Sequence, residues 1–445
     1  MYKVGMICLG CPKNQVDAEI MLSILQKEGF EIVSDTEQAD VIIVNTCGFI
    51  DSAKAEAIGE ILEVAELKNE GIIKAIVVTG CLAQRYKDEI IKEMPEVDAV
   101  IGIGANADIA KVCKTVLEGK SVCEFPSRFC LPLEGDRILT TPSYYAYLKI
   151  AEGCSNCCSY CAIPSIRGKF RSREMANIIE EAKALAENGV KELIIVAQDT
   201  TKYGIDLYGE LRLSALLREI CKIDGIEWIR LLYCYPESIT DELIETIKNQ
   251  DKICKYIDIP LQHSEDEILK AMNRKSTKKE IVALINKLRK EIPDIVIRTT
   301  FIAGFPGESE ENFEKLSEFA SKMQFDRYGC FAYSAEEGTP AAKMENQIDD
   351  EVKTYRAEVI MQQQREIFLK KQEMLFGKTL KVIVEGFDED EMLYFGRSYM
   401  DAPEIDTQII LSTEDELYPG QFVDVKVTGV LDDDLVAEVS GQDVI

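Results

Sequence analysis

The sequence predicts an α/β protein of three parts. These are a doubly wound N-terminal domain at residues 1–135, an open (βα)6 barrel at 136–375, and a small antiparallel β-barrel at 376–445. Short apolar strands alternate with helices through the first two parts, which is typical of parallel sheets covered by helices. From residue 377 the pattern changes to short alternating strands separated by Gly and Asp, which is typical of a small barrel.

The first domain is expected to bring three distant cysteines together. Its candidate strands are Lys3–Cys8, Val41–Asn45, Lys74–Thr79 and Ala99–Gly102, and its helices are Val16–Gln26, Ser52–Leu67, Arg85–Lys92 and Ala107–Leu117. Cys11, Cys47 and Cys81 each follow the end of a different strand. The carboxyl ends of parallel strands share one edge of the sheet, where ligands bind. Each cysteine alone would more often be a buried structural residue, so the interpretation depends on their matching positions.

Three thiolates at one site match the needs of a 4Fe-4S cluster. They fill three of its four irons and leave the fourth open to a small molecule. We therefore predict an iron–sulfur cluster at Cys11, Cys47 and Cys81.

Six βα units are expected beyond a proline-bearing linker at Glu124–Pro142. Their strands are Tyr144–Ile150, Glu192–Ala197, Trp228–Tyr233, Tyr256–Pro260, Val296–Phe301 and Tyr328–Ser334, and each but the last precedes a helical segment of ordinary length. Such a series predicts an open (βα)6 barrel whose functional groups lie on the loops at the carboxyl ends of its strands.

The loop after the first of these strands holds Cys154-x-x-x-Cys158-x-x-Cys161. Three thiolates in eight residues again fit a 4Fe-4S cluster with an open iron, which indicates chemistry rather than electron storage alone. Cys157 allows a second interpretation, two adjacent Cys-x-x-Cys pairs that bind zinc. Zinc sites usually take their ligand pairs from knuckles a dozen or more residues apart, so the iron–sulfur interpretation is favoured.

Three further loops are expected on the same rim: Gln198–Gly204, Leu261–His263 and Gly304–Glu308. His263 is the only histidine of the chain, and it is either a structural residue or a functional one. Gly304 and Gly307 either admit a ligand close to the backbone or serve only the turn into the next helix.

The C-terminal part is strongly acidic. After a long polar helix at Asp350–Leu375, residues 376–445 hold seventeen acidic and four basic side chains, a net charge of −13 within a total of −28. Its candidate strands are Leu380–Glu385, Gln408–Leu411, Phe422–Val427 and Leu435–Val439, and its acidic runs are Asp388–Glu391, Glu414–Glu416 and Asp432–Asp434. Such a surface repels nucleic-acid phosphate and attracts a cationic protein, or it merely keeps the chain soluble.

A cytoplasmic location is expected, because the chain opens with an apolar strand and shows neither a signal-peptide pattern nor an apolar run of membrane-spanning length. Its fifteen cysteines should then be reduced or bound to metal.

With Tyr160 the barrel loop reads Cys-x-x-x-Cys-x-aromatic-Cys, and this resembles the signature of radical S-adenosylmethionine (radical SAM) enzymes. Within that superfamily the chain resembles the methylthiotransferases from end to end, through Gly10–Asn14, Asn45–Phe49, Thr79–Cys81, Gly153–Arg173 and a C-terminal barrel similar to the TRAM domain. The runs Cys11–Asn14, Ile163–Gly168, Ala197–Gly204 and Tyr333–Thr339 are similar to the RimO type, which modifies an aspartate in the twelfth protein of the small ribosomal subunit.

The resemblance implies two 4Fe-4S clusters and S-adenosylmethionine as cofactors, with Tyr160, Gln198 and Gly304 in the S-adenosylmethionine pocket. S-adenosylmethionine would be cleaved at the Cys154/Cys158/Cys161 cluster to a radical that removes hydrogen from the aspartate β-carbon. The Cys11/Cys47/Cys81 cluster would present the methylated sulfur. The implied partners are a basic ribosomal protein as substrate and an electron donor protein.

Two other functions remain open on the sequence. One is methylthiolation of tRNA adenosine, for which Arg167, Lys169, Arg171 and Arg173 would contact phosphate, although the same cluster is also explained as a solvated or carboxylate-binding patch. The acidic barrel makes tRNA the less favoured partner. The other is a non-catalytic iron–sulfur or zinc protein, which would leave two open three-cysteine sites without a purpose.

Overall fold

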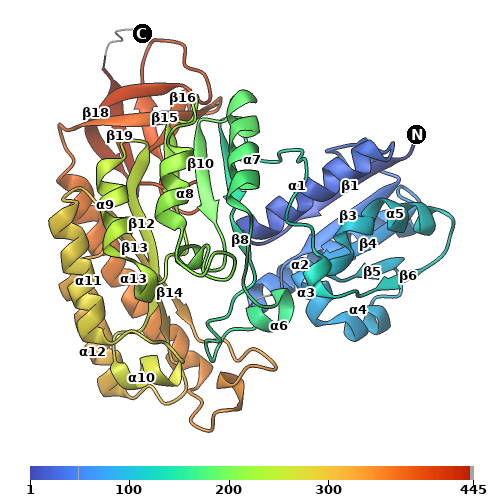
Figure 1. Ribbon diagram of the computed structural model, residues 1–445, viewed down its shortest axis with the longest axis horizontal. Coiled ribbons are helices and arrows are strands. Elements are labelled where there is room, and N and C mark those ends of the chain that lie inside the picture. The colour runs from blue at the N-terminus through green and yellow to red at the C-terminus, as the bar shows by residue number, and fades with distance from the viewer. Residues whose placement is uncertain (49, 441–445) are drawn as a thin grey trace.

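The computed structural model describes residues 1–48 and 50–440 as three packed units (Figure 1). Phe49, which closes the Asn45–Phe49 motif, and residues 441–445 of the predicted third domain lie outside the described residues. Two parallel six-stranded sheets and a closed five-stranded barrel confirm the predicted fold class. The exact boundaries near residues 135 and 375 stay predictions.

The N-terminal sheet has the strand order β2-β1-β3-β4-β5-β6, with parallel pairing throughout. The strands are β1 (Lys3–Cys8), β2 (Glu31–Ile32), β3 (Val41–Thr46), β4 (Ala75–Gly80), β5 (Ala99–Ile101) and β6 (Val122–Glu124). Helices α1 (Pro12–Lys27), α2 (Asp51–Asn69), α3 (Cys81–Arg85), α4 (Lys87–Glu93) and α5 (Ile109–Leu117) connect them. The order reverses between β1 and β3, so the sheet has its switch point there, where open α/β sheets bind ligands.

The middle sheet has the order β14-β13-β12-β11-β10-β7 and is also parallel. The strands are β7 (Tyr145–Lys149), β10 (Glu192–Val196), β11 (Trp228–Leu231), β12 (Ile253–Gln262), β13 (Val296–Ala303) and β14 (Arg327–Ala332). The helices are α7 (Met175–Glu187), α8 (Leu213–Ile220), α9 (Asp241–Asn249), α10 (Asp266–Ala271), α11 (Lys278–Glu291), α12 (Glu310–Met323) and α13 (Asp350–Glu373). Apolar side chains of one sheet face pack with these helices in the largest core cluster.

The loop region after β7 contains the short pair β8 (Ala151–Glu152) and β9 (Arg171–Ser172), and between them α6 (Ile163–Arg167). The Cys154 loop therefore begins immediately after a strand, at the carboxyl end of the sheet, as predicted.

The C-terminal barrel closes in the order β15-β16-β17-β19-β18. Its strands are β15 (Thr379–Asp388), β16 (Leu393–Ser398), β17 (Ile409–Ser412), β18 (Phe422–Leu431) and β19 (Asp434–Val439). Strand β16 was not among the predicted strands, and the β17–β19 pair is parallel while the other pairs are antiparallel.

The barrel packs against the amino-terminal ends of the middle strands (Figure 1). Trp228, the first residue of β11, has its ring 4.8 Å from that of Phe422. Glu192, the first residue of β10, lies between Arg230 and Arg397 at 2.7 Å and 2.8 Å, and all three side chains are buried. The barrel is thus at the opposite end of the strands from the Cys154 loop.

Helix α1 is buried on two sides. Ala18, Met21 and Leu25 pack in the core of the N-terminal sheet. Val16 and Ile20 pack against Tyr145, Tyr147 and other residues of the inner face of the middle sheet. This one helix therefore joins the first two units.

Candidate functional site

The three N-terminal cysteines meet at the carboxyl edge of adjacent strands, as predicted. Cys11 follows β1 and precedes α1, Cys47 follows β3, and Cys81 follows β4 as the first residue of α3. Cys11 and Cys47 thus flank the switch point. Burial raises the pKa of the Cys81 thiol to about 11, and the nearby Cys11 and Cys47 contribute to the rise. The ionised form of Cys81 is therefore unfavourable at this buried position unless a positive charge lies close to it.

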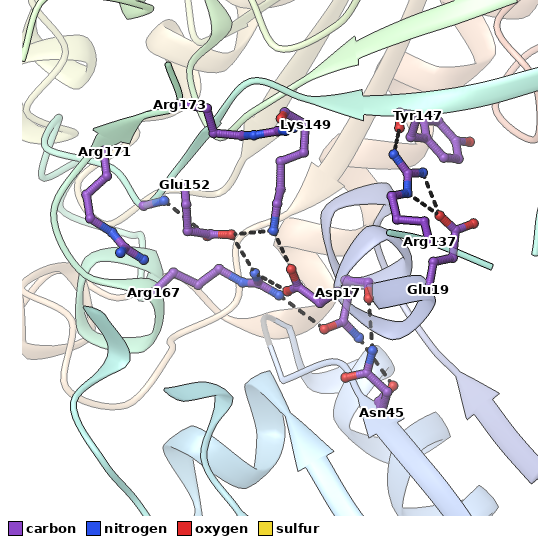
Figure 2. Close-up of polar contacts among 12 residues, drawn as sticks. Asp17, Glu19, Asn45, Arg137, Tyr147, Lys149, Glu152, Arg167, Arg171 and Arg173 are labelled. Atoms are coloured by element: carbon purple, nitrogen blue, oxygen red, sulfur yellow. Dashed lines mark hydrogen bonds and ion pairs between the residues drawn. The ribbon is translucent and has the colours of Figure 1, made fainter. Parts of the chain in front are cut away.

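Two asparagines of the sequence motifs hold these loops together. The Asn14 side-chain amide donates to the carbonyl of Leu9 at 2.9 Å and of Asn45 at 3.2 Å. In return, the Asn45 side-chain amide donates to the Asn14 carbonyl at 2.9 Å (Figure 2). These hydrogen bonds therefore position the loops of Cys11 and Cys47 relative to one another.

Glycines permit the close approach of the same loops. Gly10 has φ +88°, and a Cβ added to it would lie 2.5 Å from the Cys47 Cβ and 2.8 Å from the Cys47 Sγ. Gly80 has φ +95°, and its Cβ would lie 2.4 Å from the Thr46 carbonyl oxygen. Any side chain at these positions would push the cysteine loops apart.

The second set lies in the loop between β8 and α6. Cys154 and Cys158 are buried, Cys161 is half-buried, and Cys157 is exposed with φ +54°. Burial raises the pKa of Cys154 to about 11 and also raises that of Cys161. The different exposure of Cys157 favours Cys158 as the inward-facing member of the pair and separates Cys157 from the proposed ligands.

Both sets offer the soft thiolate donors that iron–sulfur clusters take. In a cubane cluster each thiolate binds a different iron, so its ligands do not converge on one point. Among the described residues, no group of three or more His, Cys, Asp or Glu side chains is arranged to hold a single metal ion.

A cavity of about 200 Å³ adjoins the Cys158 side chain. Its walls include Lys202, Tyr235 and Arg274. The Arg274 guanidinium stacks 4.3 Å from the Tyr235 ring centre, and its Nη1 is 4.0 Å from the Cys158 Sγ. Sequence reasoning missed Arg274, because a single arginine after a short helix has no distinctive spacing.

The three residues predicted for the S-adenosylmethionine pocket have different surroundings. Tyr160 packs with Phe305 and Tyr333 in a small apolar cluster. The Gln198 side-chain amide donates to Glu152 at 2.9 Å, while its carbonyl oxygen is buried without a hydrogen-bond partner. A Cβ at Gly304 would lie 2.3 Å from the Lys353 Cγ, so helix α13 fills the space beside this glycine. Only Gln198 thus presents a buried polar atom that a ligand would satisfy.

His263 is buried in a polar network instead of facing an open site. Its Nε2 lies 3.2 Å from the Glu308 carboxylate, and its Nδ1 accepts from the Glu265 backbone N–H at 3.0 Å. Glu308 also pairs with Arg356 at 2.8 Å and accepts from the Gly304 N–H. The structural interpretation of His263 is therefore favoured.

The predicted basic cluster is divided. Arg167 and Arg173 are buried in ion pairs, Arg173 with Glu181 at 2.6 Å, while Arg171 donates to the Phe129 carbonyl at 2.9 Å. Lys169 alone is exposed. The interpretation of this cluster as a phosphate-binding patch is wrong for Arg167 and Arg173, because carboxylates compensate their charges. For Arg171 and Lys169 it stays a prediction.

Comparison with known families and proteins gives matches along the whole chain. Residues 3–102 match the uncharacterized protein family UPF0004, residues 148–320 the radical SAM superfamily, and residues 376–439 the TRAM domain. The ribosomal protein uS12 methylthiotransferase RimO of Acetivibrio thermocellus is 54% identical over 445 residues, which cover 98% of each chain. That of Lachnoclostridium phytofermentans is 52% identical over 435 residues, covering 98% of this chain and 99% of the relative.

Solved structures show the same fold at low identity. The radical SAM methyltransferase TsrM from Kitasatospora setae aligns with a TM-score of 0.55 and 14% identity, over 74% of this chain and 73% of that chain.

The fold and these matches define a radical SAM methylthiotransferase, a class whose cofactors are S-adenosylmethionine and iron–sulfur clusters. This confirms the class predicted from the sequence. Nearly the full length is shared with relatives at about half identity. The chain belongs to the RimO family.

Among the described helices, none is both long and apolar enough to cross a membrane.

Proposed function

We propose that the protein transfers a methylthio group to the β-carbon of an aspartate in ribosomal protein uS12. Near-complete alignment with RimO proteins, which are named ribosomal protein uS12 methylthiotransferases, supports the proposal. The single structural observation behind it is the presence of two three-cysteine sets at the carboxyl edges of two parallel sheets. The protein would act in the cytoplasm, where its substrate is found, with an electron donor protein as a second partner.

Two 4Fe-4S clusters are proposed, one held by Cys11, Cys47 and Cys81 and the other by Cys154, Cys158 and Cys161. When bound, the cluster at Cys154, Cys158 and Cys161 supplies the electron that cleaves S-adenosylmethionine. The cluster at Cys11, Cys47 and Cys81 supplies the site of sulfur transfer. Tyr160, Gln198 and Gly304 are proposed to line the S-adenosylmethionine pocket. Of these, Gln198 has the strongest support, because its buried oxygen lacks a hydrogen-bond partner.

Neighbouring loops hold the cysteine loop in place. The Ser159 N–H donates to the Met272 carbonyl at 3.0 Å, and the Asn273 side chain donates to the Cys157 carbonyl at 2.8 Å. On the other side, Asn156 donates to the Asp199 carboxylate at 2.8 Å. These contacts hold the cysteine loop at the carboxyl end of the middle sheet. Cys154 and Cys158 are buried there, and burial keeps water away from the reacting groups.

The substrate assignment is tested by offering small ribosomal subunits and bulk tRNA side by side to the reconstituted enzyme under anaerobic conditions. We expect the mass of uS12 to increase by one methylthio group in a reaction that requires S-adenosylmethionine, with no modified adenosine in tRNA. Modification of tRNA alone would overturn the substrate assignment. Failure to modify either substrate, with both clusters intact, would overturn the proposed reaction.

Gly10→Ala is expected to lower the iron content of the reconstituted protein toward one cluster per chain, because the new Cβ collides with Cys47. Gly29→Ala is the matched control. Gly29 has the same φ of +88°, but nothing lies within 4 Å of its added Cβ. It should lose only about 1–2 kcal/mol to backbone strain and keep its iron. Equal iron in both variants would show that the tight approach of Gly10 to Cys47 is dispensable.

Reversing the exposed acidic run Asp388–Glu391 to lysine should raise KM for the ribosomal substrate, flatten its salt dependence and leave kcat unchanged. Exposed charges act over about a Debye length, roughly 8–10 Å at physiological salt, and this hairpin tip belongs to the unit at the opposite end of the strands from the cysteines.

The control for net charge reverses four exposed acids in α2 and at its C-terminal end, Glu56, Glu63, Glu66 and Glu70. It changes the total charge equally at another place. If both variants raised KM equally, the overall charge of the protein, and not the surface of the C-terminal barrel, would govern association with the ribosomal substrate.

A further inference from the structure

Arg167 crosses from one proposed cluster site to the other. It is the last residue of α6, six positions after Cys161, and only 1% of its side chain is exposed. Its Nε lies 3.4 Å from the Sγ of Cys81, a residue of the N-terminal unit, and donates to it. The side chain of Cys81 also packs with Ala162 and Ile166, the latter on the same short helix.

A buried network orients the guanidinium (Figure 2). Nη1 lies 2.7 Å from Asp17 and 3.1 Å from Glu152, and Nη2 donates to the Asn14 Oδ1 at 3.1 Å. Lys149 pairs with the same two carboxylates. Two acids and two bases thus compensate one another, and the guanidinium is held with Nε directed at the sulfur.

The charge balance of this network is relevant to a cluster at Cys81. Hydrogen bonds and positive charge near the sulfur ligands stabilise the more negative, reduced state of an iron–sulfur cluster and so raise its reduction potential. Without Arg167, the carboxylates of Asp17 and Glu152 would keep Lys149 as their only cation in this network. The net charge of the network would change from neutral to negative.

We propose that Arg167 is a positioning residue that raises the reduction potential of the cluster at Cys11, Cys47 and Cys81 and ties that cluster to the loop of the other one. This inference rests on the proposed function, because it needs the N-terminal cysteines to hold a cluster. It assigns to Arg167 an electrostatic role toward the sulfur-transfer site that is separate from contact with the substrate.

The test uses the full-length Cys154→Ala/Cys158→Ala/Cys161→Ala protein, in which only the N-terminal cluster remains. Its midpoint potential is measured by redox titration followed by electron paramagnetic resonance. Arg167→Gln should shift the potential to a more negative value and alter the spectrum. Arg167→Lys keeps the charge but loses the planar donor, so its shift should be smaller.

Two further variants separate this role from a general effect on packing. Asp17→Asn removes one carboxylate while keeping Arg167, so it should shift the potential in the opposite, positive direction. Arg173→Gln is the matched control, since Arg173 is a buried arginine of the same segment that pairs with Glu134 and Glu181. It should leave the potential unchanged.

An unchanged potential and spectrum in Arg167→Gln would overturn the inference. If that variant fails to fold, shifts of the same sign in Asp17→Asn and Arg167→Lys would overturn it equally. Absence of iron from the triple-alanine protein itself would instead overturn the proposed ligand set, and the inference with it. The iron content therefore distinguishes the two failures.

Discussion

Replacing Cys154, Cys158 and Cys161 with alanine is expected to abolish reductive cleavage of S-adenosylmethionine and to leave about one 4Fe-4S cluster per chain. The physical reason is that these thiols are the proposed anchors of the cluster that donates the electron. Iron and acid-labile sulfide after anaerobic reconstitution, and release of 5'-deoxyadenosine, measure the two effects. Stoichiometric zinc in the parent protein would contradict the assumption that these cysteines hold an iron–sulfur cluster, and the prediction with it.

The reciprocal variant with alanine at Cys11, Cys47 and Cys81 provides the control. It should abolish methylthiolation but retain cleavage of S-adenosylmethionine, because it keeps the thiols of the Cys154 loop and the hydrogen bonds that Ser159, Asn273 and Asn156 donate. If cleavage were lost while spectroscopy showed an intact cluster at Cys154, Cys158 and Cys161, the roles of the two clusters, cleavage and sulfur transfer, would be assigned wrongly.

Glu192→Gln should destabilise the contact between the middle sheet and the C-terminal barrel by about 3–5 kcal/mol. The substitution leaves the buried guanidiniums of Arg230 and Arg397 without the carboxylate that now lies 2.7 Å and 2.8 Å from them. Trp228 is the only tryptophan and contacts Phe422 of the barrel, so its fluorescence during urea denaturation reports on this contact.

The pH dependence of this effect has a defined sign. Burial alone would raise the pKa of Glu192, but Arg397 and Arg230 lower it below its ordinary value of 4.5. A carboxylate with a lowered pKa contributes stability that is complete above the ordinary value and is lost as pH falls below it. The difference between parent and Glu192→Gln should therefore narrow below about pH 4.5.

Glu93→Gln is the control for this stability measurement, because its ion pair with Lys92 is largely exposed. Exposed pairs contribute about 0–1 kcal/mol, so the urea midpoint should hardly move. A shift as large as that of Glu192→Gln would mean that burial does not determine the cost.

The sequence predicted the placement of the six cysteines in the fold, because that placement depends on local pattern and one topological rule. A cysteine after a strand of a parallel sheet must lie at the carboxyl edge, whatever the packing of the rest. Strands as short as Glu31–Ile32 and Val122–Glu124 escaped prediction, since two or three residues show no periodicity. Strand β16 escaped because Gly396 and Arg397 interrupt its apolar pattern.

Contacts between the units were beyond sequence reasoning. Lys149 stands in an apolar strand and Glu152 follows it, which signals buried charge in need of partners, and the two pair with each other. The second partner of Lys149, Asp17, is 132 residues away along the chain and could not be inferred. The same limit explains the misread arginines. Arg167 looked like part of a surface patch because Asp17, one of the acids that pair with it, lies 150 residues away. Arg173 did so because the local pattern does not show that Glu181 of the next helix turns toward it.

Helix α1 makes the position of Cys11, a proposed cluster ligand, depend on how the N-terminal domain and the middle sheet are placed relative to one another. It starts directly after Cys11, and it is packed on both sides for much of its 16 residues, a rigid rod of about 24 Å. Any hinge motion that swings the N-terminal domain away from the middle sheet must act on this rod and therefore on Cys11. The position of Cys11, and with it the proposed N-terminal cluster, therefore depends on the contact between the two domains, so substitutions that loosen this contact would also disturb the site.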